Sequence, residues 1–167
     1  MKRSSLILVI LLLCIISSAQ QLQLEVNGSA NFENSVFEIR EAGLDFSSAL
    51  EVQSSIFLTL HQGGGFTKKN NPNKKWRIAI FKQDDWNDDL KLEVKRTGKG
   101  NNIGNNGKPN VHGGENYQVV RNTETWFFEG KGEIRDIPLR IKLSGVSLKM
   151  GAGSHNSRIV FTVYDGW

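Results

Sequence analysis

Apolar and polar residues alternate with a period of two along much of this chain, as they do in a β-strand with one face on a core. The clearest segment is residues 90–94, LKLEV, where three apolar residues alternate with a lysine and a glutamate. A helix would spread those charges around its surface, so this segment is predicted to be a half-buried strand. Residues 139–143 repeat the pattern, and Pro138 is predicted at the strand start, where its missing N–H does least harm.

Further segments show the alternation or are apolar on both faces, as central strands are. These additional predicted strands are residues 22–26, 36–40, 55–60, 76–81, 117–120, 125–128 and 158–164. No window of ten residues shows convincing helical periodicity. About eight or nine short strands, separated by Gly and Asn turns, predict an all-β fold, and we favour an antiparallel β-sandwich over a barrel. Trp76 and Trp126 lie inside apolar strands and are predicted to pack in the core.

Two Gly/Asn-rich stretches interrupt the strands. Gln62–Lys75 contains three consecutive glycines, and Thr97–Asn116 contains six glycines and six asparagines. Such composition offers little surface for packing, so both stretches are predicted to be long, mobile loops.

The N-terminus predicts a secretory signal peptide over residues 1–19. Two basic residues precede eleven apolar residues, which are too few for the roughly 20 that a membrane-spanning helix needs. Small residues then end at Ala19, after which cleavage would leave Gln20 as the N-terminus. Cys14, the only cysteine, follows Leu13 and not the small residue of a lipoprotein signal. We therefore expect an exported protein, in the periplasm or on the cell surface, with no membrane anchor after cleavage.

Cleavage would change the composition in two ways. The remaining residues 20–167 contain no cysteine, so no internal disulfide can form even though export would permit one. Loss of Lys2 and Arg3 reduces 21 basic residues to 19 against 17 acidic ones, a net charge of +2. This small excess predicts no nucleic-acid partner. The length of 148 residues fits a single domain stabilised by packing alone.

Residues 84–89 form an acidic cluster that a calcium ion could use. An EF-hand starting at Asp85 would, however, have leucine at the required glycine and arginine at the required glutamate. A charged hairpin turn is therefore favoured over a calcium site. The histidines, His61, His112 and His155, lack zinc-site spacing, so no metal or cofactor is expected.

Catalytic motifs are likewise not recognisable. The nearest approach to a nucleophile elbow, at Gly145–Lys149, ends in lysine where glycine is needed. Glu124 and Glu129 are five residues apart and are predicted to point to opposite faces of a strand, which argues against a glycosidase pair. The sequence therefore predicts a protein that is not an enzyme.

Two tryptophans lie outside the predicted core strands. Trp86 is in the acidic turn and Trp167 is the last residue. Their rings could stack on sugars, so both are candidate ligand contacts of a carbohydrate-binding module.

The last third of the chain carries a family resemblance. Ser144-Gly145-Val146, a glycine-rich bend at 151–153 and the segment SRIVFTVY at 157–164 resemble the closing strands of bacterial secreted pilin-like sandwiches of the spore coat protein U type. The similarity covers mainly residues 139–164. It implies an immunoglobulin-like sandwich with a structural or adhesive role at a bacterial surface, whose subunits are joined by strand exchange. The expected partners are other protein subunits or surface components.

Leu22, Leu24 and Val26 would suit such a donated strand. They would equally suit the first strand of a sandwich that closes its own sheet, and this second interpretation is favoured because the chain is long enough. We therefore expect a non-enzymatic secreted structural or adhesive module. The alternative is a carbohydrate-binding module that uses exposed tryptophans and loops.

Overall fold

The computed structural model describes residues 22–30, 32, 50–62, 71–84, 86, 90–103, 109–146 and 156–166. These residues form strands joined by turns, and every strand pair is antiparallel. In chain order the strands are β1 (Leu22–Asn27), β2 (Leu50–Gln62), β3 (Lys75–Gln83), β4 (Lys91–Arg96), β5 (Asn101–Asn102), β6 (Asn110–Gly113), β7 (Gln118–Val119), β8 (Thr125–Lys131), β9 (Ile134–Ser144) and β10 (Arg158–Asp165).

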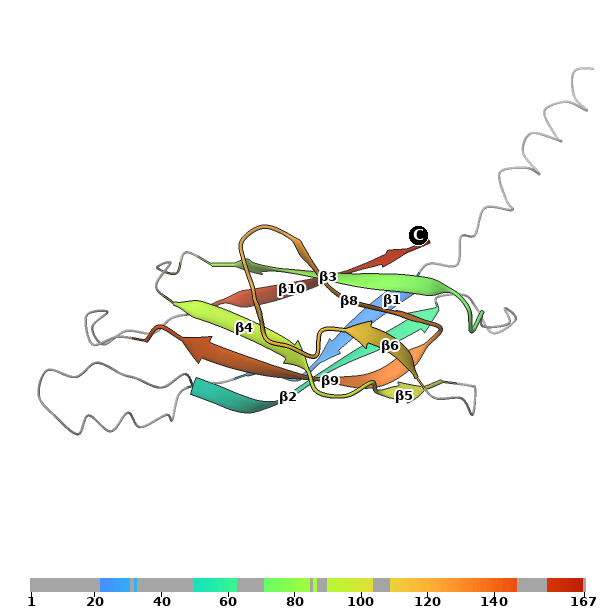
Figure 1. Cartoon of the computed structure of the whole chain (residues 1–167), viewed down its shortest axis with the longest axis horizontal. Helices are drawn as coiled ribbons and strands as arrows, with labels where there is room; N and C mark the ends of the chain where they lie inside the picture. Colours follow the sequence, from blue (N-terminus) through green and yellow to red (C-terminus); the bar gives the residue numbers. More distant parts are fainter. Residues whose placement is uncertain are drawn as a thin grey trace, which may run out of the picture.

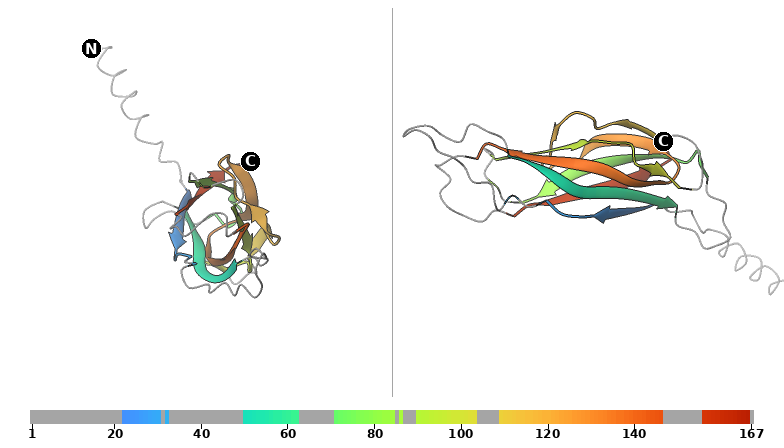
Figure 2. Two further views of the ribbon diagram at one scale, coloured as in Figure 1. Left: turned by 90° about the vertical axis from the view of Figure 1, so that its left-hand side faces the viewer. Right: turned by 90° about the horizontal axis from the view of Figure 1, so that it is seen from below.

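The strands form two packed sheets. The six-stranded sheet has the order β1-β2-β9-β4-β7, with β5 also paired to β9, and the four-stranded sheet has the order β10-β3-β8-β6. Figure 1 views the sandwich from its side, with β3 and β10 along the top and β2 and β9 along the bottom. The view from below in Figure 2 shows β9 beside β2, with β1 at the edge. The predicted antiparallel β-sandwich is confirmed.

Successive strands from β2 onward lie in opposite sheets, with β5 as the exception. Neighbours within a sheet are consequently distant in sequence: β2 pairs with β9, and β3 pairs with both β8 and β10. This alternation is typical of jelly-roll sandwiches, whereas in immunoglobulin domains successive strands more often pair within one sheet.

The core lies between the two sheets and follows from the alternating pattern. In β4, Leu92 and Val94 are buried, whereas Lys91 is exposed. The most deeply buried side chains come from both sheets: Leu58, Leu60, Trp76, Ile78, Ile80, Val94, Val111, Val120, Ile134, Ile137 and Leu139. Burial of such side chains contributes about 1.5–3 kcal/mol each to folding, and this packing replaces the disulfides that the sequence cannot form.

Trp76 anchors the four-stranded sheet from inside. Its ring is fully buried, as predicted, and its Nε1–H donates to the Gly132 carbonyl oxygen at 2.7 Å. The ring lies over Gly130 on the neighbouring strand, where an added Cβ would come within 2.4 Å of it. Glycine at 130 therefore makes the space for Trp76.

Pro138 lies inside β9, so its predicted position at a strand start is wrong. The segment before it is a strand because β2 and β5 pair with it. On the side of β4, the regular pairing ends at Leu139, and the Thr97 N–H then donates to the Pro138 carbonyl oxygen at 2.9 Å. Pro138 thus lies where β9 changes its pairing partner from β4 to β5. Because no interstrand hydrogen bond from the backbone N–H of residue 138 is needed at this point, proline is tolerated.

The stretch Thr97–Asn116, predicted to be one long loop, contains β5 and β6. The buried Arg96 side chain fixes it to the core edge, because its Nε donates to the Gly113 carbonyl oxygen at 3.0 Å and its Nη1 donates to that of Gly98 at 2.7 Å. Two carbonyl groups of the Gly-rich segment, those of Gly98 and Gly113, are thereby satisfied by a side chain.

The first strand, β1, pairs with β2 of the same chain over its whole length. Leu22 is buried, Leu24 packs against the core and Val26 is 47% exposed. This is the arrangement of a sandwich that closes its own sheet. The predicted signal peptide, the predicted strand at 36–40 and Trp167 lie outside the described residues. Among the described residues, no helix is long and apolar enough to cross a membrane.

Candidate ligand-binding surface

Four outward side chains form a row across the four-stranded sheet. Tyr164 of β10 is opposite Arg77 of β3, Arg77 is opposite Glu129 of β8, and Glu129 is opposite His112 of β6. Residues next to them along three of the strands, Ile78, Phe128 and Val111, are buried in the core. Because side chains alternate along a strand, the row lies on the solvent side of the sheet.

A β-bulge in β8 brings Trp126 to this same face. Ile78 is opposite Phe128 and Ala79 is opposite Trp126, which leaves Phe127 as an extra residue. Phe127 and Phe128 are both buried, while Trp126 has 54% of its surface exposed. The prediction that Trp126 packs in the core is therefore wrong, because regular alternation contains no bulge. Bulges commonly re-aim a side chain next to a functional site.

The Trp126 ring has an aromatic and a cationic neighbour. The centre of the Tyr164 ring lies 5.2 Å away at an interplanar angle of 73°, and the Arg77 guanidinium carbon lies 4.9 Å from the Trp126 ring centre. Arg77 also forms an ion pair with Glu129 at 3.1 Å. These contacts hold an exposed indole in place, which lowers the entropy that a ligand would have to remove.

Tyr164 is held from its other end by Glu124. Its hydroxyl donates to Glu124 Oε2 at 2.8 Å, and this hydrogen bond, with a contribution from desolvation, raises the pKa of Tyr164 above its ordinary value of 10.0. The hydroxyl is therefore protonated at physiological pH and the ring is 40% exposed. Trp126 and Tyr164 together give this face a rigid aromatic cluster with polar groups around it.

Glu124 and Glu129 share this outer face, contrary to the sequence prediction that they point to opposite faces. The bulge at Phe127 adds one residue between them and removes the regular alternation. Glu124 accepts the hydrogen bond from Tyr164, and Glu129 is paired with Arg77. Both carboxylates thus have a role in orienting the aromatic cluster.

Trp86, the candidate contact from the sequence, is a partly buried side chain that packs against the core. Its Nε1–H donates to the Asn156 carbonyl oxygen at 2.7 Å, and Lys82 Nζ lies 5.6 Å from its ring centre. Trp86 therefore ties the segment after β3 to the residues just before β10. The structure does not bring it to the Trp126 face.

Asp84 reinforces this end of the sandwich. Its carboxylate is fully buried and pairs with Lys82 Nζ at 2.8 Å, and it also accepts a hydrogen bond from the Ser157 hydroxyl. Burial by itself would raise the pKa of Asp84, but the hydrogen bonds from Lys82 and Ser157 outweigh it and lower the pKa below 3.8. Asp84 is therefore a buried anion that links β3 to β10. The other acidic residues of the 84–89 turn lie outside the described residues.

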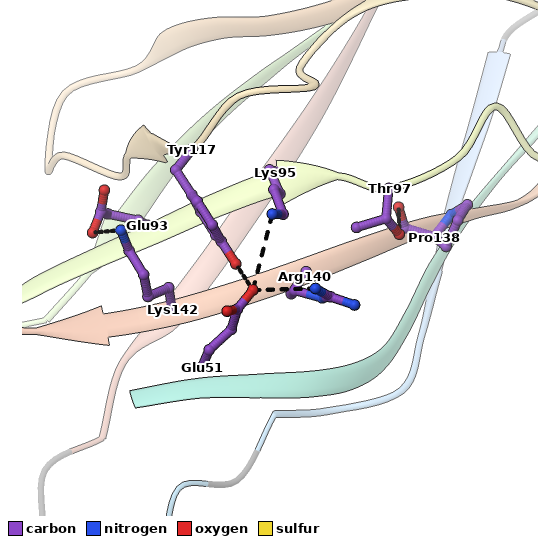
Figure 3. Close-up of polar contacts among 8 residues, drawn as sticks. All are labelled: Glu51, Glu93, Lys95, Thr97, Tyr117, Pro138, Arg140 and Lys142. Carbon is purple, nitrogen blue, oxygen red and sulfur yellow. Dashed lines mark hydrogen bonds and ion pairs between the residues drawn. The ribbon is translucent and has the colours of Figure 1, made fainter. Parts of the chain in front are cut away.

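The outer face of the six-stranded sheet carries a polar cluster of a different kind, which Figure 3 shows. The Tyr117 hydroxyl donates to Glu51, and Arg140 and Lys95 approach the same carboxylate at 3.3 and 3.9 Å. The hydrogen bond from Tyr117 is the main cause that lowers the pKa of Glu51. Desolvation and the bond to Glu51 in turn raise the pKa of Tyr117.

Tyr117 also joins Glu51 to a second ion pair in this cluster. Lys142 Nζ lies 2.8 Å from Glu93 Oε2, and the Ser144 hydroxyl donates to the same oxygen at 3.2 Å. The Nζ atoms of Lys95 and Lys142 lie 4.2 and 4.4 Å from the centre of the Tyr117 ring. The cluster therefore satisfies its own charges across β2, β9 and β4.

Metal-binding side chains do not gather within the described part of the chain: no group of three or more His, Cys, Asp or Glu residues is arranged to hold an ion. His61 faces Glu25 at 3.5 Å, and His112 Nε2 lies 2.6 Å from Asn110 Oδ1. His155 is outside the described residues.

Comparison of the chain with protein-family models, curated proteins and solved structures gives no match.

Sequence reasoning missed Trp126 and Tyr164 as surface residues. Tyr164 could have been found from the alternation in β10. Every second residue of that strand packs against the core, and Tyr164 is one of the residues between them, which point outward. Trp126 depends on the bulge, for which the sequence TWFFEG gives no signal beyond two consecutive phenylalanines.

Proposed function

We propose that this protein is a non-enzymatic carbohydrate-binding module that acts outside the cell, with Trp126 as the ring on which a sugar stacks. The observation that carries the proposal is the exposed Trp126 at the β8 bulge, held between Tyr164 and Arg77. Trp126 and Tyr164 form an exposed aromatic pair whose orientation is fixed by contacts within the protein, and such side chains are enriched at binding surfaces.

The composition of the surface around Trp126 favours a sugar over a protein partner. The centre of a protein-docking surface is depleted in glutamate, whereas here Glu124 is bonded to Tyr164 and Glu129 is paired with Arg77 beside the two rings. Sugars present an apolar ring face together with hydroxyl groups, which match an aromatic ring with charged hydrogen-bonding groups beside it. An adhesive role at a bacterial surface would follow from such binding.

A glycan array, together with pull-down on insoluble polysaccharides, tests this proposal. Trp126→Ala should weaken binding to the recognised glycan by at least about tenfold, or about 1.4 kcal/mol, while the thermal unfolding midpoint changes little. Lys142→Ala, on the opposite outer face, is the matched control and should bind as the unmodified protein does. Trp86→Ala distinguishes the two tryptophans: loss of binding with this variant, and not with Trp126→Ala, would contradict the proposal.

A second candidate is the structural module joined by strand exchange, which the resemblance to pilin-like sandwiches implies. It is favoured by the position of β1 at the edge of its sheet, where the described residues include a pairing partner on one side only. An exposed edge can accept or donate a strand. Deletion of residues 20–27 should then abolish SDS-resistant ladders or fibres of the mature protein. Purified protein that stays monomeric would argue against this candidate.

A further inference from the structure

We infer that the ligand of the Trp126 face is an acidic glycan, one of whose carboxylate or sulfate groups binds at Lys75 and Lys131. This inference rests on the proposed function and specifies its ligand class. Lys75 of β3 is directly opposite Lys131 of β8, and both side chains are exposed. Each lysine is two residues along its strand from Arg77 or Glu129, so the pair lies on the same outer face as Trp126.

The two lysines form a cross-strand pair of equal charge. The Cβ atoms of directly opposite residues lie about 4.5–5.5 Å apart, and like charges at this spacing repel each other. Asp165, an acidic residue at the same end of the sheet, is paired with Lys74 at 2.9 Å. An anion held between the two lysine ammonium groups would replace this repulsion with two attractive contacts, so the pair suits the acidic group of a ligand.

The outer face of the four-stranded sheet has an excess of positive charge. Its strands contribute four outward cations and one outward carboxylate, which are Lys75, Arg77, Lys131, Arg158 and Glu129. Glu124, just before β8, adds a second carboxylate through its hydrogen bond with Tyr164. With His112 neutral, these four positive and two negative side chains carry a net charge of +2, which attracts an anionic ligand to this surface.

The charges are distributed unevenly, which places the acidic group away from the stacked sugar. Beside the aromatic rings, Arg77 is already paired with Glu129 at 3.1 Å. Trp126 is opposite Ala79, and Lys75 is four residues further along β3, a separation of about 13 Å at 3.3 Å per residue. This separation is longer than a single sugar ring. A glycan of two or more sugars can therefore place an uncharged ring on Trp126 and an acidic group at the lysine pair.

The same distribution favours an acidic glycan over a nucleic acid. Single-stranded nucleic acids also stack on aromatic side chains, but they carry a phosphate on every nucleotide. A base on Trp126 would therefore bring phosphates next to the Glu129 and Glu124 carboxylates, which costs binding energy. In a glycan, the acidic group can belong to a different sugar from the one that stacks.

A panel of paired glycans tests this inference with the mature protein, residues 20–167. Each uronic-acid or sulfated oligosaccharide is presented beside a carboxyl-reduced or desulfated counterpart of the same backbone. We expect at least one acidic glycan to bind about tenfold or more tightly than its neutral counterpart at low ionic strength. The difference should shrink as NaCl is added, because salt screens exposed charges. The carboxylate and sulfate members of the panel show which acid the lysine pair recognises.

Three variants assign the effect to particular residues. Lys75→Gln combined with Lys131→Gln should abolish the preference for the acidic form, leave binding of the neutral form unchanged and cause no fall in the thermal unfolding midpoint, because repulsion is relieved. Trp126→Ala should weaken both forms by the same factor, because stacking does not depend on the acid. Lys91→Gln combined with Lys95→Gln removes the same charge from β4 on the other outer face and, as the control, should keep the preference.

The outcomes separate this inference from the proposed function. Equal affinity for acidic and neutral forms, with binding still lost in Trp126→Ala, would overturn the acidic ligand and leave the proposed function standing. An equal loss of preference in the β4 control would assign it to overall charge and would also overturn the inference. If single-stranded DNA binds more tightly than every glycan and depends on the lysine pair, the ligand is a nucleic acid and both fail. Both also fail if no glycan binds or if Trp126→Ala affects none.

Discussion

On the outer face of the six-stranded sheet, charged side chains from three strands contact one another and surround Tyr117, whereas on the outer face of the four-stranded sheet Trp126 and Tyr164 are exposed. Both faces arise from the same alternation of inward apolar and outward residues. On the first face, ion pairs between neighbouring strands give the charges of the cluster around Tyr117 partners within the cluster. On the second face, two aromatic side chains are exposed, and water is a poor partner for their rings.

The polar face and the candidate binding face differ in which of their groups already have partners within the protein. The Glu51 and Glu93 carboxylates already interact with Tyr117, Lys142 and Arg140. A ligand there would have to replace existing contacts. At Trp126 a ligand would gain contacts without breaking any of the hydrogen bonds that hold Tyr164 and Glu124 together.

The largest expected effect contrasts the two tryptophans on opposite sides of the four-stranded sheet. Trp76→Ala should lower the free energy of unfolding by about 3–5 kcal/mol, because it leaves a cavity in the core. Trp126→Ala should lower it by less than about 1 kcal/mol, because that ring is mostly exposed and loses only surface contacts. Urea denaturation measures both. Equal losses for the two variants would contradict the assignment of Trp126 to the outer face.

The next effect tests whether burial decides the strength of an ion pair. Asp84→Asn should cost about 2–4 kcal/mol, since it leaves the nearly buried Lys82 ammonium without its anion. The folded-state pKa of Asp84 is lowered, so its stabilising contribution is present above pH 3.8 and is lost as the pH falls through that lowered pKa. The variant should show a smaller loss of stability in this acid range. Ser157→Ala, which removes one hydrogen bond only, should cost about 1 kcal/mol.

A smaller effect is expected for the partly exposed pair between Lys142 and Glu93, whose side chains are 24% and 16% exposed. A double-mutant cycle with Lys142→Met and Glu93→Gln should give a coupling free energy of about 0.2–1 kcal/mol. Because the pair is accessible to water, 1 M NaCl should reduce the coupling. A coupling as large as the cost of Asp84→Asn would show that this face is not a solvated one.

The smallest effect concerns Glu51. Tyr117→Phe removes the hydrogen bond that lowers the Glu51 pKa, so this pKa should rise toward its ordinary value of 4.5. Glu51 stabilises the fold above that value, and this stabilisation is lost as the pH falls through its lowered folded-state pKa. NMR titration of the side-chain carboxyl measures the shift. Tyr164→Phe, on the other face, is the control and should leave Glu51 unchanged.

Most of the fold could be predicted because the strands carry a strong period-two pattern. The predicted strands at 90–94, 139–143 and 158–164 match β4, β9 and β10, since burial on one face fixes both pattern and register. The errors occur where the pattern is interrupted. Pro138 is tolerated because β9 changes partner beside it, and Trp126 is exposed because β8 has an extra residue.

Alternation of apolar and polar residues was thus sufficient to determine that this chain is a β-sandwich with its core between two sheets. It could not determine which strands pair, because β2 and β9 meet across some 80 residues and such contacts depend on the packing of the whole domain. The bulge at Phe127 arises in the same way, since it accommodates two adjacent phenylalanines in one core. Only the tertiary structure therefore placed Trp126 beside Tyr164 and Arg77, and with them the candidate binding surface.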